Sequence, residues 1–96
     1  MGACHGLEIG FVFGTYGPDF CGSGPLVESL SEKIQEAWAA FARTGSPDGG
    51  LLGDWPQYCH QRKTMILGED TRVEEAPYEA ERLFWQNIDN RAKNPA

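Results

Sequence analysis

The sequence holds two histidines, the side chains best suited to accept a proton near neutral pH. His5 lies in a short run between Gly2 and Gly6. Glycines permit tight backbone turns and leave the imidazole uncrowded, as a general base that meets a substrate requires. His60 lies in a polar run without such a setting and is expected to be a surface residue. A loop histidine is also consistent with a solvated side chain, so the residues alone make His5 a candidate base without a defined role.

No pattern in the sequence supplies a nucleophile for this base. Ser23 follows Cys21 by two residues, so the Gly-x-Ser-x-Gly spacing of a nucleophile elbow is absent. The histidines that follow Cys4 and Cys59 point away from those thiols on an extended chain. Phosphate-binding loops, His-Glu-x-x-His and dinucleotide fingerprints are also absent, and the carboxylates are scattered. The candidate base therefore has no evident group to activate.

The three cysteines, at positions 4, 21 and 59, are an odd and irregularly spaced set without a Cys-x-x-Cys pair. They are predicted to be reduced and partly buried, although one disulfide is formally possible. A metal site built from the two Cys-His pairs would need ligands adjacent in sequence to converge on one ion, which is unusual. We therefore predict no metal and no cofactor, and a thiol or metal-binding mini-domain is the least favoured functional hypothesis.

The composition restricts the partners of the chain. Its 96 residues carry 14 acidic and 8 basic side chains, a net charge of −6, which disfavours binding to nucleic acid. No apolar run approaches the length of a membrane span. The N-terminus lacks the pattern of a signal peptide, and Gly6 stands where a myristoylation motif needs Ser or Thr. We therefore expect a soluble, cytoplasmic protein with no nucleic-acid or membrane partner.

The elements that position these residues are expected to form a single partial domain over 1–96, mainly α with a small β hairpin. The expected segments are a loop that carries His5 at 1–25, an amphipathic helix at about 26–44, a loop with short strands at 45–76, and a C-terminal helix at about 77–92. Within the first segment, the apolar run Ile9 to Phe13 fits either a buried strand or one or two helical turns. The strands near Met65 and Val73 form either a hairpin or two separate extended segments.

The central helix has the most regular pattern in the chain. Apolar residues recur at three- and four-residue spacing, namely Leu30, Ile34, Ala37, Trp38, Phe41 and Ala42. Ser29 and Glu32 fit a capping box, although a start just after Pro25 is also consistent. Gly45 is suited to end the helix, and Trp55 is expected to pin the following loop to the body of the domain. The last helix is expected from about Pro77, with an aromatic stripe of Tyr78, Phe84, Trp85 and Ile88.

Three motifs now point to a family. The run Gly-Ala-Cys-His-Gly-Leu-Glu-Ile-Gly-Phe-Val-Phe-Gly from Gly2 to Gly14 resembles the catalytic-histidine segment of the type-B carboxylesterases, the α/β-hydrolase family that includes the cholinesterases. Ala37 to Pro47 resembles the Ala-Trp-x-x-Phe-Ala-x-Thr-Gly-x-Pro stretch of that family. Trp55 to Tyr58 matches its Trp-Pro-x-Tyr, and the segment up to Leu67 matches its late short strand. The motifs stand in the family's order and cover nearly the whole chain.

The resemblance implies the C-terminal portion of an α/β-hydrolase that lacks most of the central sheet. It assigns to His5, which Gly6 follows, the histidine that takes the proton from a serine hydroxyl. Glu8 corresponds to an acidic position near that histidine, and we expect it to have a buried, structural hydrogen-bonding role outside the triad. The serine, the oxyanion glycines and the triad acid lie upstream in the family. Because triad members act as a unit, the chain alone is not expected to be active.

Two functional hypotheses follow. In the first, the chain is the catalytic-histidine segment of a carboxylic ester hydrolase, which meets an ester substrate only if the missing N-terminal part complements it. In the second, it is a non-catalytic helical module that self-associates or binds a partner, with His5 a relic. The aromatic stripes pack on the missing sheet in the family, so a homo-oligomer is expected to cover them here. Trp38→Ala is expected to cost several kcal/mol through lost packing.

Overall fold

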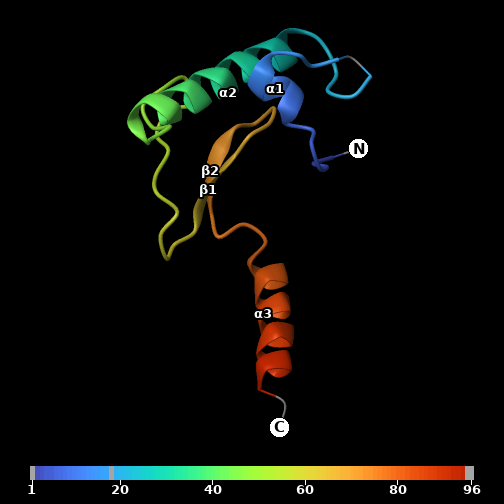
Figure 1. The fold of residues 1–96 in the computed structure, drawn as a ribbon, viewed down its shortest axis with the longest axis vertical. Helices are drawn as coiled ribbons and strands as arrows, with labels where there is room; N and C mark the ends of the chain where they lie inside the picture. The colour runs from blue at the N-terminus through green and yellow to red at the C-terminus, as the bar shows by residue number, and fades with distance from the viewer. Residues whose placement is uncertain (1, 18, 95–96) are drawn as a thin grey trace.

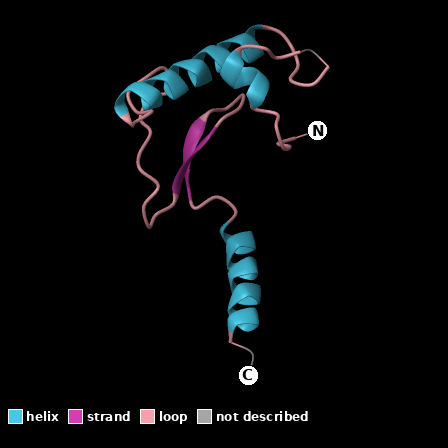
Figure 2. Cartoon of the chain, viewed as in Figure 1, coloured by secondary structure: helices cyan, strands magenta, loops and turns pink. Residues whose placement is uncertain are grey.

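The computed structural model describes residues 2–17 and 19–94. Its elements are α1 (Ile9–Phe13), α2 (Pro25–Thr44), β1 (Lys63–Ile66), β2 (Arg72–Glu75) and α3 (Glu79–Lys93). Figure 1 shows α1 lying against α2, the two strands beside them, and α3 extending away towards the C-terminus. Helices dominate and the only strands in the described ranges form one small hairpin (Figure 2), which confirms the predicted fold class.

Residues 9–13 form a short helix, so the predicted loop at 1–25 is interrupted by α1. The helix ends at Gly14, whose left-handed conformation (φ 67°) lets its N–H donate to the carbonyl of Gly10. A strand at this position would have to pair with another strand, and among the described residues β1 and β2 pair only with each other, so residues 9–13 add no third strand to the hairpin. Local hydrogen bonding therefore decides between the two alternatives in favour of the helix.

α2 begins at Pro25, whose missing N–H is no loss at the first helical position. Gly24 precedes it without a capping side chain. Ser29 and Glu32 therefore lie inside the helix, and the predicted capping box between them is wrong. The C-terminal prediction is confirmed, because Gly45 adopts φ 82° and its N–H donates to the carbonyl of Phe41 at 2.7 Å. None of the described helices is long and apolar enough to cross a lipid bilayer.

The buried face of α2 is narrower than the predicted apolar stripe. Ser31, Ile34 and Ala37 are 1%, 3% and 3% exposed, whereas Trp38 is 40% exposed. The Trp38 ring packs against Trp55 with 6.4 Å between ring centroids, which confirms that Trp55 pins its loop to the helix. Because Trp38 forms part of a surface groove, we now expect Trp38→Ala to cost less than truncation of Ile34.

The hairpin resolves the alternative left open for the two extended segments. β1 and β2 pair antiparallel, with Met65 opposite Val73 and Ile66 opposite Arg72. In the turn between them, the Thr71 hydroxyl donates to the carbonyl of Gly68 at 2.8 Å and accepts from its N–H at 3.3 Å. Met65 is the buried residue of the pair of strands. This turn brings Gly68 close to α2, as the site below shows.

α3 begins at Glu79, two residues after the predicted start at Pro77, because Tyr78 has a left-handed backbone (φ 58°) and interrupts the helical conformation. No described residue of α3 is buried. Its aromatic stripe is exposed, with Trp85 65% accessible. The helix has an apolar face that nothing in the described chain covers (Figure 1).

The first turn of α3 is tied to the loop before β1 through Glu79. Arg82 Nε donates to Glu79 Oε1 at 3.0 Å, and Arg62 Nη1 lies 3.6 Å from the same oxygen. The hydrogen bond from Arg82, together with the positive charges of Arg82 and Arg62, lowers the pKa of Glu79 against a smaller opposing effect of desolvation. Folding therefore favours the ionised carboxylate.

This lowered pKa predicts a loss of order at the start of α3 in acid. A carboxylate whose pKa is depressed by folding stabilises the fold above its unfolded pKa, and that contribution is lost as pH falls through the folded pKa. We expect amide signals of Glu79 and Arg82, measured by NMR, to shift towards random-coil values as the pH falls below the ordinary pKa of a glutamate. Glu79→Gln should remove this transition. Titration of Glu79 at or above the usual glutamate value would contradict the prediction.

Candidate functional site

The structure places His5 on the surface, in two successive turns that lead into α1. The Leu7 N–H donates to the carbonyl of Cys4 at 3.3 Å, and the Ile9 N–H donates to the carbonyl of Gly6, also at 3.3 Å. Gly6 has φ 79°, a conformation that glycine adopts without strain. The His5 side chain is exposed. The glycine thus turns the backbone sharply while the imidazole stays accessible, as the sequence predicts for a base.

Glu8 lies between this turn and α1, at the N-terminal boundary of the helix. Its side chain is exposed, and no described residue donates a hydrogen bond to its carboxylate. The expected buried, hydrogen-bonding role is therefore not realised in this chain. A carboxylate without a donor in reach stays hydrated, because burying it unpaired is costly.

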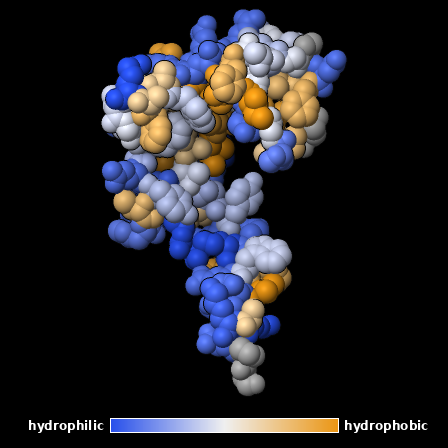
Figure 3. Space-filling model, viewed as in Figure 1, coloured by the Kyte–Doolittle hydropathy of each residue, from blue (hydrophilic) through white to orange (hydrophobic). Residues whose placement is uncertain are grey.

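Beside the His5 turn lies a half-open hollow of about 320 Å³. Three parts of the chain line it. The segment around His5 and α1 contributes Ala3, Cys4, Leu7, Glu8 and Phe11, α2 contributes Leu30 and Ile34, and the hairpin turn contributes Leu67 and Gly68. Figure 3 shows apolar side chains gathered in this upper part of the molecule. The hollow is lined mainly by carbon, with Glu8 as its ionisable carboxylate. His5 itself is not among the lining residues, although its neighbour Cys4 is.

α1 is held on α2 by a buried serine that the sequence analysis did not single out. The Ser31 hydroxyl donates to the carbonyl oxygen of Phe11 at 2.8 Å and accepts from Gln35 Nε2 at 3.0 Å. Ser31 is 1% exposed. The signal in the sequence is its spacing, three residues before Ile34 on the same helical face.

Two further contacts seat α1 closely. A Cβ added at Gly10 would lie 3.0 Å from Tyr16 Cα and 3.2 Å from Cys21 Sγ. The Cys21 thiol also donates to the carbonyl of Leu7 at 3.7 Å, a weak hydrogen bond. We expect Gly10 to be needed here, because any larger side chain would push α1 off the loop that follows it.

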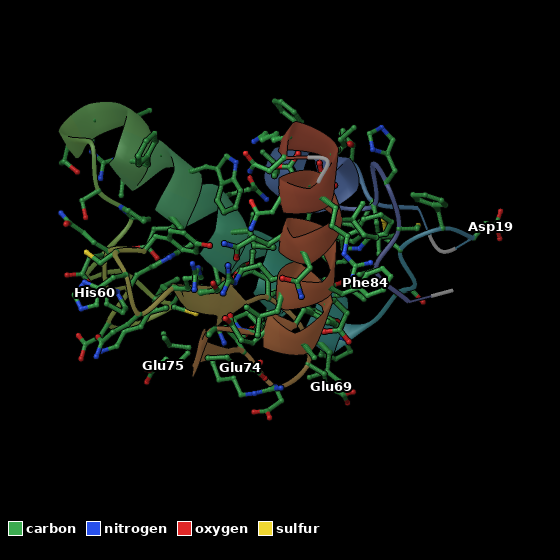
Figure 4. All side chains as sticks on the ribbon, turned by 90° about the horizontal axis from the view of Figure 1, so that it is seen from below. Asp19, His60, Glu69, Glu74, Glu75 and Phe84 are labelled. Atoms are coloured by element: carbon green, nitrogen blue, oxygen red, sulfur yellow. The ribbon has the colours of Figure 1, made fainter. Side chains whose placement is uncertain are left out.

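The remaining candidate groups do not gather around His5. His60 is exposed, as predicted, in the turn before β1. Figure 4 shows Glu69, Glu74 and Glu75 along one side of the view and His60 and Asp19 at opposite sides, so these groups form no common site. In residues 2–17 and 19–94, no three His, Cys, Asp or Glu side chains lie together as metal ligands would.

Comparison with known proteins places these features in a family. Residues 1–85 match the Carboxylesterase family. The chain is 42% identical to Carboxylesterase 4A of Bos taurus over 88 residues, which are 91% of this chain and 16% of that protein. It is 34% identical to Carboxylesterase 1D of Rattus norvegicus over 94 residues, again 16% of that protein. The chain thus spans about one sixth of the length of these relatives.

Solved structures show the same relation. A PNB esterase superposes with a TM-score of 0.71 at 36% identity, over 82% of this chain and 17% of that one. The carboxylesterase EST55 of Geobacillus stearothermophilus gives a TM-score of 0.71 at 31% identity, over 86% of this chain and 19% of that one. Most of this chain is therefore arranged as in a small part of these larger esterase structures.

Proposed function

This chain belongs to the carboxylesterase family, and on that premise we propose that it is the C-terminal segment of a serine esterase that carries the catalytic histidine, His5. The observation that supports this most is the exposed imidazole on a turn fixed by Gly6 and α1, next to an apolar hollow. Because the matched relatives are named carboxylesterases, carboxylic esters are the proposed substrate class.

In this proposal His5 acts through proton transfer. It accepts the proton of a serine hydroxyl as the serine oxygen bonds to the ester carbonyl carbon, and it then returns that proton to the departing alcohol as the ester C–O bond breaks. In the second half of the reaction, His5 accepts a proton from water as the water oxygen bonds to the acyl carbon. It then gives that proton to the serine oxygen as the acyl–serine bond breaks and the acid is released. The serine, the orienting acid and the oxyanion donors come from residues outside this chain. His5 alone is then a solvated imidazole, and no hydrolysis beyond that of free imidazole is expected.

Gly6 and Glu8 have supporting roles in this proposal. Gly6 provides the left-handed turn that a side chain would strain. Glu8 lines the hollow from the His5 side, so a covering polypeptide that carries donors would bury its carboxylate and fix the start of α1. The exposure of Glu8 in this chain is consistent with a partner surface that is absent here.

Complementation tests the proposal. The chain is mixed with a carboxylesterase from which the matching segment has been removed, and the hydrolysis of an aryl ester is followed. We expect neither part to hydrolyse the ester alone and the mixture to do so. A mixture that associates, as shown by gel filtration, but hydrolyses no ester would contradict the assignment of His5.

The second hypothesis, a self-associating module, is favoured by the exposed surface. The chain exposes 7286 Å², against about 5,500 Å² for a compact monomer of its mass. Its radius of gyration is 16.6 Å, against about 12–13 Å for a compact domain of this length. Trp85 and Ile88 of α3 contribute to this excess apolar surface.

From this surface we predict association of the chain by itself. Light scattering at micromolar concentration should give the mass of a dimer or a larger species, because burial of the aromatic faces releases water from apolar surface. Phe84→Glu should shift the distribution towards monomer. A well-folded monomer at all concentrations would contradict this prediction.

A further inference from the structure

We propose that Ser31 is a positioning residue for His5. Through its hydrogen bond to the carbonyl oxygen of Phe11, it fixes α1, and with α1 the turn that carries the imidazole. The inference rests on the proposed function, since it concerns the precision with which His5 meets a serine hydroxyl. Ser31 touches neither substrate nor His5, so it acts only through the backbone that it holds.

The direction of the Ser31 hydrogen bond is unusual for a serine inside a helix. Such a hydroxyl commonly bonds to a carbonyl of its own helix, three or four residues back. Here it reaches another helix, to Phe11 at 2.8 Å. Gln35 Nε2 donates to the Ser31 oxygen at 3.0 Å, which occupies an acceptor site of the hydroxyl and leaves its single proton for Phe11.

The Phe11 carbonyl depends on this bond. α1 has five residues, too few to be stable without tertiary contacts, and the carbonyls of its last turn lack partners within the helix. The Thr15 N–H, four residues after Phe11, donates instead to Gly10 at 2.8 Å. Among the described residues, the Phe11 carbonyl accepts its hydrogen bond from the hydroxyl of Ser31.

A continuous set of hydrogen bonds connects Phe11 to the His5 turn. The Val12 N–H donates to the carbonyl of Glu8 at 2.9 Å, and the Ile9 N–H donates to that of Gly6 at 3.3 Å. A rotation of α1 on α2 therefore moves the backbone on which His5 stands. Misplacing a catalytic group by 1 Å lowers a rate by about 100-fold, so the anchor of α1 matters for proton transfer.

Hydrogen exchange in the chain itself tests the anchor. We expect Ser31→Ala to speed the amide exchange of Val12 and Thr15 by roughly tenfold, because the partly buried Phe11 carbonyl loses its partner. The matched control is Ser29→Ala, the same change two residues away at a side chain with no hydrogen bond among the described residues, and it should leave both rates unchanged. Unchanged rates in Ser31→Ala would overturn the proposal.

A second variant applies if Ser31→Ala fails to fold. Gln35→Ala removes one contact of the Ser31 oxygen, and it must speed exchange at the same two amides.

Kinetics of the complemented esterase test the positioning role. With equal amounts of assembled complex, Ser31→Ala should lower kcat about 10- to 100-fold and leave KM unchanged, whereas Ser29→Ala should change neither. Equal kcat values for the two variants, or a loss confined to KM, would overturn the role. If the unmodified chain restores no activity, the proposed function fails and the positioning role fails with it, while the exchange rates still decide whether Ser31 anchors α1.

Discussion

His5→Ala should lower the rate of ester hydrolysis by the complemented esterase by at least about 10³-fold. The reason is that the serine hydroxyl would lose the group that accepts its proton, and serine is a weak nucleophile at neutral pH without that base. Initial rates on an aryl ester, measured with equal amounts of assembled complex, give the effect. Because the His5 side chain is exposed, its removal should leave the fold and the association of the chain unchanged.

The chain offers a matched control for this substitution in its other histidine. His60 is also exposed and lies in the turn before β1, outside the residues that line the hollow beside His5. His60→Ala should therefore leave the rate unchanged. Added imidazole should restore part of the activity of His5→Ala and have no effect on the unmodified complex. Equal losses from the two histidines, or full activity in His5→Ala, would remove His5 from the mechanism.

The sequence predicted those parts of the fold that depend on local periodicity and end signals. α2 follows from its apolar spacing, and its end follows from Gly45. The run at 9–13 was ambiguous because a short apolar run of five residues satisfies both a strand and a helical turn. The start of α3 was misplaced because the left-handed backbone of Tyr78 is set by its surroundings, and a proline at the first turn is compatible with either start.

The candidate site divides in the same way. His5 could be singled out as a candidate because glycine neighbours and a family motif mark it, and both are local features of the sequence. Ser31 was missed because a serine in an apolar stripe looks like a polar interruption, and its partner Phe11 is 20 residues away. The exposure of Glu8 and Trp38 could not be predicted either, since it depends on which surfaces the rest of the domain covers.

Ile34→Ala should lower the stability of this chain more than truncation of an exposed apolar residue, because few residues carry its buried core. Ile34, Ala37 and Met65 are the buried apolar residues among those described, and Ile34 also lines the hollow beneath α1. Removing its side chain should destabilise the fold by about 2–5 kcal/mol, the sum of lost transfer free energy and the cavity that remains. Natural domains of this size are stable by only about 5–15 kcal/mol, so the midpoint of urea unfolding, followed by circular dichroism, should fall sharply.

The same substitution at Ile88 is the matched control, because it removes the same side chain from an exposed position. Ile88 lies on α3 and is 42% exposed in the single chain, against 3% for Ile34. At concentrations low enough to keep the chain monomeric, Ile88→Ala should therefore change the unfolding free energy by less than about 1 kcal/mol. The loss of stability in Trp38→Ala should lie between those of the two isoleucine variants. Trp38 is 40% exposed, but the substitution removes its ring contact with Trp55. An Ile88→Ala variant as unstable as Ile34→Ala would mean that α3 is covered in solution. In that case the difference in stability between the variant and the unmodified chain should shrink on dilution, since dissociation would expose the same face in both.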